Sequence, residues 1–204
     1  MELERRRSVV FVLGLPGAGK GTMCRRLAQK YGFEHVSIGD LLRREAATPG
    51  STYGPVIRLL GKHVPTEISL ELLKCELAKS KCDTFLLDGF PRNPELLDGW
   101  NNDMADSFPL AFALFLDCPD EICRMRIVKR AEEGSGRPDD RCVSFFERQQ
   151  RFRTGTVKVI NRLNAARAIV RVDSRANNPD AVFQDVDRVF RAYFGFSGSG
   201  SGSI

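Results

Sequence analysis

The chain has 204 residues, of which 42% are hydrophobic and 28% are charged, as expected for a globular protein with one apolar core. No apolar run approaches the roughly 20 residues that a membrane-spanning helix needs, so the sequence predicts no membrane partner. The formal net charge of +5 favours anionic ligands, but a charge of this size is by itself no signature of nucleic acid binding.

The six cysteines are scattered, and their spacings contain no C-x-x-C pair and match no zinc pattern. Scattered thiols in a sequence without a secretory signal predict a reducing compartment, so we expect a cytoplasmic protein. They are Cys24, Cys75, Cys82, Cys118, Cys123 and Cys142.

Apolar runs alternate with amphipathic stretches along the chain, which predicts an α/β fold with a parallel sheet. Most of the runs are continuous rather than alternating, as in strands buried on both faces. The predicted strands are Val9–Leu13, His35–Ile38, Thr84–Asp88, Ala111–Asp117 and Ala168–Val172. The predicted helices are Lys20–Tyr31, Asp40–Ala47 with Asp40 as the N-cap, Ile68–Ser80, Asp120–Arg130, a long stretch over Val143–Ala165, and Ala181–Tyr193.

A glycine-rich segment, GLPGAGKGT, directly follows the first predicted strand and precedes a predicted helix. Gly14, Gly19 and Lys20 fit the phosphate-loop pattern G-x-x-x-x-G-K-[ST], in which backbone N–H groups surround an anion and the lysine reaches the outer phosphates. The hydroxyl arrives one residue late, at Thr22, because Gly21 follows the lysine. The alternative interpretation is an ordinary glycine turn between a strand and a helix.

The segment TFLLDG is an apolar strand that ends in an acidic residue, Asp88. Ligands of open α/β sheets bind at the carboxyl ends of the strands, so the segment predicts that Asp88 contacts a magnesium ion through water. A turn or cap aspartate is the alternative, and the glycine loop favours the magnesium interpretation.

Arginines are concentrated between residues 124 and 153, where a solvated helix face is the usual explanation. We assign Arg124, Arg151 and Arg153 to such a face. The stretch AEEGSGRPDDR instead predicts a mobile loop, whose arginines could screen phosphate charge when the loop closes. A nucleic acid binder is disfavoured, because the aromatic residues are not interleaved as stacking platforms.

The motifs GLPGAGKGT, SIGDLLR, GKHVPTE, LLDGFPRN and GSGRPDD resemble, in order and spacing, those of nucleoside monophosphate kinases of the adenylate kinase superfamily. The resemblance runs from Val9 to Phe190 and is closest to the UMP/CMP kinase branch, through GFPRN, LDGW and LFLDCPDEIC. It implies a three-layer P-loop fold with a five-stranded parallel sheet. Residues 1–196 are expected to form one domain, with a monophosphate-binding flap at about 37–66 and a short lid at about 130–141, before a flexible Gly/Ser tail at 197–204.

The same resemblance implies roles for single residues. ATP is expected to contact Gly17, Ala18, Gly19, Lys20, Gly21, Thr22 and Arg130. The acceptor is expected to contact Ser37, Ile38, Arg43, Val64, Gly89, Arg92, Leu96, Arg137 and Arg148. Catalysis is expected to depend on Lys20, Arg126, Arg137 and Arg148, steadied by Asp139 and Asp140, with Mg²⁺ held near Thr22 and Asp88.

The implied reaction transfers the γ-phosphate of ATP to a nucleoside monophosphate, with UMP or CMP favoured, in a monomeric enzyme. The acceptor phosphate is already ionised, so no general base is needed, and His35 and His63 are expected to be structural or surface residues.

Three positions depart from the family pattern: Leu96 replaces an amide that reads the base, Ile38 replaces a small residue or threonine, and Arg141 replaces an asparagine. The base therefore stays open, with AMP as the alternative acceptor, and a P-loop switch without transferase activity is the alternative of a different class.

Overall fold

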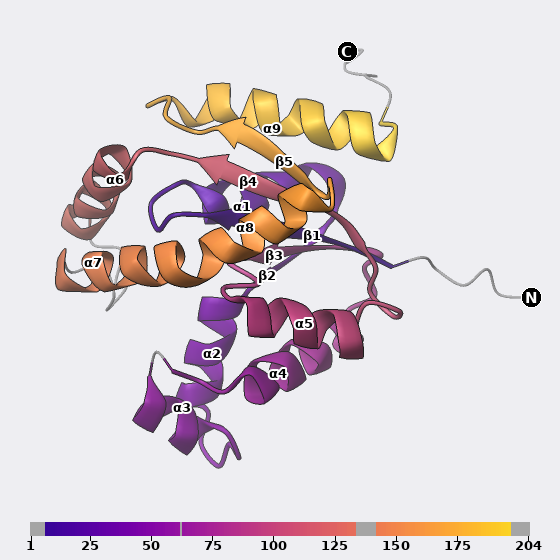
Figure 1. The fold of residues 1–204 in the computed structure, drawn as a ribbon, viewed down its shortest axis with the longest axis vertical. Coiled ribbons are helices and arrows are strands. Elements are labelled where there is room, and N and C mark those ends of the chain that lie inside the picture. The colour runs from indigo at the N-terminus through magenta and orange to yellow at the C-terminus, as the bar shows by residue number, and fades with distance from the viewer. Residues whose placement is uncertain (1–6, 62, 134–141, 197–204) are drawn as a thin grey trace, which may run out of the picture.

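The structure is a computed structural model that describes residues 7–61, 63–133 and 142–196. The side chains of residues 142–144 are not described. Five parallel strands form one sheet in the order β2-β3-β1-β4-β5 (Figure 1). The strands are β1 (Ser8–Gly14), β2 (Glu34–Ser37), β3 (Thr84–Asp88), β4 (Leu110–Asp117) and β5 (Ile169–Asp173). The predicted five-stranded parallel sheet is confirmed, and its central strand β1 is buried almost throughout.

Nine α-helices and one π-helical segment are found in the described part of the chain. The α-helices are α1 (Lys20–Tyr31), α2 (Ile38–Ala47), α3 (Gly54–Leu60), α4 (Thr66–Lys79), α5 (Pro94–Asp103), α6 (Asp120–Glu132), α7 (Cys142–Arg151), α8 (Val157–Ala165) and α9 (Pro179–Phe194). The π-helical segment η1 (Phe152–Thr156) joins α7 to α8. The long stretch predicted over Val143–Ala165 is therefore helical, but with a π-helical interruption.

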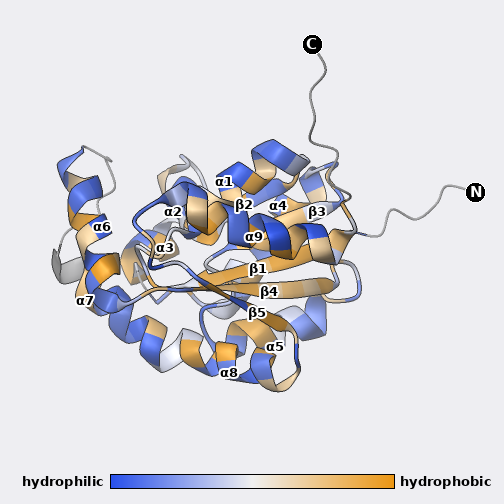
Figure 2. Cartoon of the chain, turned by 90° about the horizontal axis from the view of Figure 1, so that it is seen from above, coloured by the Kyte–Doolittle hydropathy of each residue, from blue (hydrophilic) through white to orange (hydrophobic). Residues whose placement is uncertain are grey.

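The sheet is the middle of three layers, because side chains of β1 alternate between two apolar clusters. Val9, Phe11 and Leu13 enter one cluster with buried residues of α4, α5 and α8. Val10 and Val12 enter the other cluster with buried residues of α1, α6 and α9. Figure 2 shows the hydrophobic strands between helices whose outer faces are hydrophilic. Burial on both faces explains why the strands read as continuous apolar runs.

Two sequence expectations near the second strand are wrong. Ile38 was assigned to that strand, but β2 ends at Ser37 and Ile38 begins α2. Asp40 was assigned as the N-cap, but Ser37 is the cap, because its hydroxyl accepts a hydrogen bond from the backbone N–H of Asp40 at 3.3 Å. Asp40 instead lies in the first helical turn, where its charge suits the helix dipole.

Two helices were not predicted at all, α3 and α5. The start of α5 carries a readable signal, since Asn93 caps the helix through Leu96 N–H at 2.9 Å and Pro94 occupies the first turn. Helix α3 has only seven residues, which gives too short an apolar period to recognise. Together α2 and α3 project from the carboxyl end of the sheet (Figure 1).

Among the described residues, no helix combines the length and the apolar character needed to cross a membrane. Of the residues assigned to the lid, 130–132 end α6, and residues 134–141, with Arg137, Asp139, Asp140 and Arg141, lie outside the described part. The Gly/Ser tail at 197–204 also lies outside it.

Candidate active site

The loop between β1 and α1 has a backbone shape that glycine makes possible. Gly17 and Gly19 adopt φ values of 91° and 96°, in the left-handed region that other residues rarely occupy. A Cβ atom on Gly17 would also stand 2.3 Å from the carbonyl oxygen of Cys123. The loop therefore folds tightly against the start of α6, with its N–H groups close to the N-terminus of α1, an arrangement that binds anions.

Lys20 is the first residue of α1, and its ammonium group bends back over the loop. Its Nζ donates hydrogen bonds to the carbonyl oxygens of Gly14 and Leu15, both at 2.9 Å. Burial lowers the pKa of Lys20, and the charge of Arg92 lowers it further, against the opposing effect of Asp88. The side chain is therefore already folded over the loop, where a phosphate could take up its hydrogen bonds.

Asp88 is the last residue of β3 and lies beside Val12 of β1 and Ser37 of β2 in the sheet register. Burial raises the pKa of this carboxyl group, but His35, Lys20 and Arg92 together outweigh it, so the pKa lies below its ordinary value. The carboxylate is therefore charged near neutral pH, as the magnesium assignment requires.

The Asp88 carboxylate also explains the glycine that follows Lys20. A Cβ atom on Gly21 would stand 3.2 Å from Asp88 Oδ2, which is tight for a heavier side chain. Thr22 is the next residue of α1, and its hydroxyl accepts a hydrogen bond from Arg25 at 3.5 Å. Carboxylate and hydroxyl oxygens are hard donors of the kind that Mg²⁺ prefers, so the side chains near Gly21 fit this ion.

Two arginines from different elements meet over Gly39 of α2. A Cβ atom on Gly39 would lie 3.4 Å from nitrogens of both Arg43 and Arg92. Arg43 donates to Asp40 Oδ1 at 2.5 Å, and Arg92 Nε donates to the carbonyl oxygen of Gly89 at 3.0 Å. The two guanidinium groups thus converge on one place, as a doubly charged phosphate would require.

Arg92 also links this place to the glycine loop. A Cβ atom on Gly89 would lie 3.6 Å from Arg92 Nη2 and 4.0 Å from Lys20 Cε. The three cationic side chains therefore follow one another from the loop to α2, with Asp88 and Gly89 between them. Such a row can hold two phosphate groups side by side.

The π-helical segment η1 packs against the backbone of Arg92 and holds it in place. The hydroxyl of Thr156 donates to the carbonyl oxygen of Arg92 at 3.0 Å. Gly155 lets the helix come this close, because a Cβ atom there would stand 2.6 Å from the same oxygen. Sequence reasoning missed Gly155 and Thr156, although π-bulges are frequent at functional sites.

The remaining predicted arginines have different surroundings. Arg126 of α6 donates to the carbonyl oxygen of Ala176 at 2.7 Å, and its other nitrogen lies 3.5 Å from Cys118 Sγ. These contacts place it near Cys118, just after β4, and Ala176, just after β5. Arg130 lies in the last turn of α6 and Arg148 lies on α7, and both are half-buried.

The residues expected at the base are mostly apolar and packed inward. Ile38 and Leu96 belong to the same core cluster, with exposed fractions of 2% and 7%. Ser37 and Val64 are half-buried, and the Ser37 hydroxyl is engaged as the cap of α2. Neither Ile38 nor Leu96 can donate or accept a hydrogen bond with its side chain.

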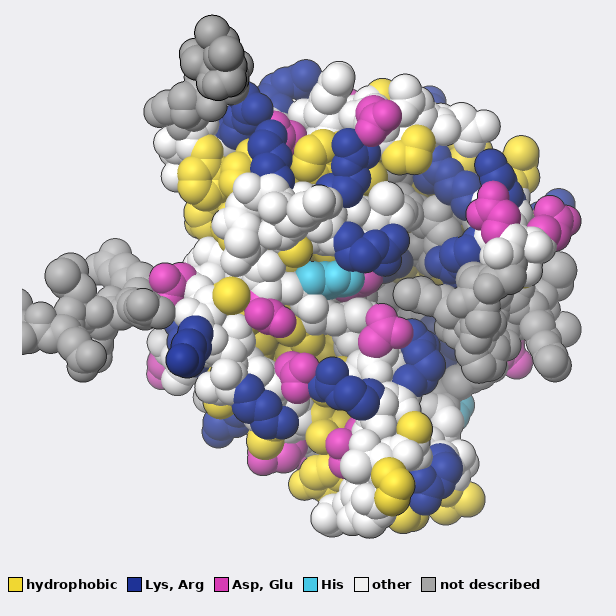
Figure 3. Space-filling view, turned by 180° about the vertical axis from the view of Figure 1, so that it is seen from behind, with side chains coloured by type: hydrophobic (Ala, Val, Ile, Leu, Met, Phe, Trp, Pro, Cys, Tyr) yellow, Lys and Arg dark blue, Asp and Glu magenta, His cyan; other side chains and the backbone are white. Residues whose placement is uncertain are grey.

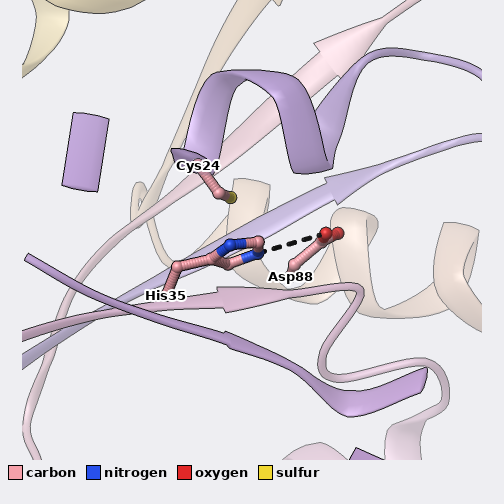
Figure 4. Close-up of side chains that lie close together, drawn as sticks. All are labelled: Cys24, His35 and Asp88. Atoms are coloured by element: carbon pink, nitrogen blue, oxygen red, sulfur yellow. Dashed lines mark ion pairs between the residues drawn. The ribbon is translucent and has the colours of Figure 1, made fainter. Parts of the chain in front are cut away.

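A group that sequence reasoning did not find lies beside the phosphate loop. Cys24, His35 and Asp88 come from α1, β2 and β3, and their side chains point toward one another (Figure 4). His35 Nε2 lies 3.4 Å from Asp88 Oδ2. Sequence spacing gave no signal for this group, because only the sheet brings the three elements together.

Basic side chains also border a hollow in one face of the molecule, so the surface offers an anion several cations at once (Figure 3). The glycine loop suits an anion, Asp88 suits a divalent cation, and the paired arginines suit a second anion. Together the geometry suits two phosphorylated ligands and a divalent cation.

Comparisons with known proteins agree with this geometry. Residues 13–145 match the family described as AAA domain. The chain is 43% identical to the UMP-CMP kinase of Rattus norvegicus over 190 residues, which cover 89% of this chain and 96% of the relative. It is 42% identical to the UMP-CMP kinases of Homo sapiens, over 89% of the chain and 96% of the relative, and of Sus scrofa, over 91% and 97%. The resemblance inferred from the motifs is confirmed.

Proposed function

We infer the function from the family: the chain contains an AAA domain and belongs to the UMP-CMP kinase family of nucleoside monophosphate kinases. It is accordingly a phosphotransferase that uses ATP to convert a nucleoside monophosphate into the diphosphate, with UMP and CMP favoured. The observation that carries the proposal is the row of Lys20, Arg92 and Arg43, which joins an anion-binding loop to a second cationic place.

The loop and Lys20 bind the phosphates of ATP. The N–H groups of Gly17, Ala18, Gly19, Gly21 and Thr22 face the phosphates, and Lys20 gives up its bonds to Gly14 and Leu15 to reach the transferred group. Thr22 and Asp88 would hold Mg²⁺, with Asp88 acting through water. When bound, this ion neutralises charge on the phosphate oxygens.

Arg43 and Arg92 bind the phosphate of the acceptor, and Ser37, Val64 and Gly89 line its path. Because that phosphate is ionised near neutral pH, it attacks without a general base, and its alignment with ATP supplies most of the rate. The family pattern assigns Arg126, Arg137 and Arg148 to the transferred phosphoryl group, and Arg130 to the ATP side. For Arg126 this role requires release of its hydrogen bond to the carbonyl oxygen of Ala176.

Specificity for the base rests on the wall formed by Ile38 and Leu96. An apolar wall rejects a larger or smaller ring by shape, which discriminates less than a hydrogen bond does. We propose a shallow preference for pyrimidines, in a monomeric cytoplasmic enzyme whose residues 1–196 form one domain, with a flap at about 37–66 and a lid at about 130–141.

The test is ADP formation with ATP and Mg²⁺ in the presence of CMP, UMP, AMP or GMP, each compared with a reaction that lacks a monophosphate. We expect ADP to appear only when a monophosphate is added, with the highest kcat/KM for CMP or UMP. ATP turnover that is independent of the monophosphate would contradict transfer. A preference for AMP above about tenfold, or ~1.4 kcal/mol, would assign the chain to adenylate kinases instead.

A further inference from the structure

The cluster of Cys24, His35 and Asp88 has the composition of a transition-metal site. It offers one thiol sulfur, one imidazole nitrogen and one carboxylate oxygen, and these three atoms all lie within 4.8 Å of one another. Zinc is the ion that commonly takes such a mixed set, because sulfur and nitrogen ligands suit it and do not suit Mg²⁺. Three protein ligands leave a fourth position open, as in many zinc sites that are not purely structural.

The spacing suits tetrahedral coordination. With zinc bonds of about 2.0–2.3 Å, neighbouring ligand atoms lie roughly 3.4–3.6 Å apart. His35 Nε2 and Asp88 Oδ2 are 3.4 Å apart, so this pair already has the required separation. Cys24 Sγ lies within 4.8 Å of the other two ligand atoms, so a shift of about 1.4 Å or less brings it to coordination distance.

His35 provides an independent reason to expect a ligand. Its Nε2 atom is buried and faces Asp88 Oδ2 at 3.4 Å as an ion pair, but it makes no hydrogen bond of normal geometry among the described residues. A buried nitrogen without a well-formed hydrogen bond is costly, and coordination would remove that cost. The atom points at Asp88 from the neighbouring strand (Figure 4).

The charges of the cluster also balance. A zinc ion bound by one thiolate and one carboxylate carries no net charge, so it adds no repulsion toward Lys20, whose charge both Cys24 and Asp88 feel. Zinc binds the thiolate form of cysteine, so binding displaces the proton of Cys24.

We propose that Cys24, His35 and Asp88 form a zinc-binding site under the phosphate loop. The site shares Asp88 with the magnesium position, so zinc and the catalytic use of Asp88 exclude each other. The consequence is inhibition of the kinase by zinc that excess Mg²⁺ relieves. This consequence rests on the proposed function, whereas zinc binding itself does not.

The binding test uses metal-free protein titrated with Zn²⁺ against a chromogenic zinc chelator. We expect one zinc ion per chain, and a loss of affinity of roughly a hundredfold or more in Cys24→Ala and His35→Asn, since even outer-shell partners cost 10- to 100-fold. Matched controls are Cys75→Ala, an exposed thiol 3.6 Å from a Glu71 oxygen, and His63→Asn, an exposed histidine. The controls should bind zinc like the wild type.

The absorption spectrum of bound Co²⁺ reports coordination by the Cys24 thiolate, and it would not change if Cys24 only supported the fold. Loaded wild type should show thiolate-to-cobalt charge-transfer absorption, which Cys24→Ala should lack and Cys75→Ala should keep. Melting curves without metal check that Cys24→Ala and His35→Asn are folded, and Cys24→Ser is a second variant that conserves volume. Equal zinc affinity in Cys24→Ala and Cys75→Ala, or a cobalt spectrum without the thiolate band, would overturn the site.

The activity arm separates the two proposals. With saturating ATP and CMP, zinc should inhibit wild type and Cys75→Ala at least tenfold more strongly than Cys24→Ala, as expected when a ligand is lost. Zinc binding that depends on Cys24 without inhibition of the wild type supports the zinc site and overturns the assignment of Asp88 to magnesium.

Discussion

The phosphate end and the base end of the candidate active site are built in opposite ways. The loop from Gly14 to Gly19 offers backbone groups to a phosphate, and its glycines with positive φ values make this shape possible. The base end has only side chains to work with, and at Ile38 and Leu96 these are apolar and packed into the core. A backbone site tolerates little change, whereas a side-chain site can drift. We therefore expect chemistry to be fixed and base selection to be adjustable.

Lys20→Met should have the largest effect, because it removes the cation next to the transferred phosphoryl group. We expect turnover to fall by roughly a hundredfold or more, a few kcal/mol of lost charge stabilisation. Lys20→Arg should not restore it, since a planar guanidinium does not replace a compact ammonium. Steady-state kinetics measures the effect, with Lys129→Met on the exposed face of α6 as control. Normal turnover in a folded Lys20→Met protein would contradict the loop's role.

Arg92→Ala should mainly harm use of the acceptor. The lost contact is a charged, bidentate one worth about 1.5–3 kcal/mol, so kcat/KM for CMP should fall about 10- to 100-fold. The KM for ATP should change little. Arg44→Ala is the control, because Arg44 lies on α2 beside Arg43 but pairs with Glu76. If kcat/KM falls for ATP but not for CMP, Arg92 binds a phosphate of ATP rather than that of the acceptor.

The sequence predicts the phosphate end well, for physical reasons. Gly17, Gly19 and Lys20 belong to one contiguous motif, and Asp88 is found because an apolar strand ends there. The sheet follows from continuous apolar runs that only burial on both faces explains. These signals are local, so no knowledge of the tertiary structure is needed.

The rest depends on contacts between distant segments. Arg43 and Arg92 meet only because the first turns of α2 and the segment after β3 come together at Gly39. The π-helical segment leaves no periodic trace within the long helical stretch, so its contact with Arg92 stayed hidden. Cys24 and His35 fit no metal-spacing pattern, because the sheet rather than the sequence brings them to Asp88. Leu96, which replaces the amide that reads the base in the family pattern, is visible in the sequence, but its burial is not.

Leu96→Asn should increase the selectivity of the enzyme for a pyrimidine base. An amide at this position adds a donor and an acceptor that can read a pyrimidine edge, so we expect the ratio of kcat/KM for CMP over AMP to rise about tenfold. The variant should also lose about 1–3 kcal/mol of stability, because part of the amide is buried without a partner. Leu96→Met is the control that keeps the wall apolar. An unchanged ratio in a folded Leu96→Asn protein would mean that the base does not reach Leu96.

The smallest effect is expected from Thr156→Val, which tests whether the π-helical segment positions Arg92. The substitution keeps the shape of the side chain but removes the hydrogen bond to the Arg92 carbonyl oxygen, worth about 0.5–1.5 kcal/mol. Because this bond fixes the backbone rather than the ligand, kcat/KM for CMP should fall only about threefold, with little change in the KM for ATP.

Thr154→Val is the matched control for this last prediction. Its hydroxyl lies in the same π-helical segment but donates to the carbonyl oxygen of Gln150 at 2.9 Å, away from Arg92. Both variants lose one hydroxyl–carbonyl hydrogen bond, so a general loosening of the segment would affect them equally. A fall in acceptor use confined to Thr156→Val, and absent when Arg92 is already alanine, would connect the segment to that arginine. Equal effects in the two threonine variants would show that the segment serves stability alone.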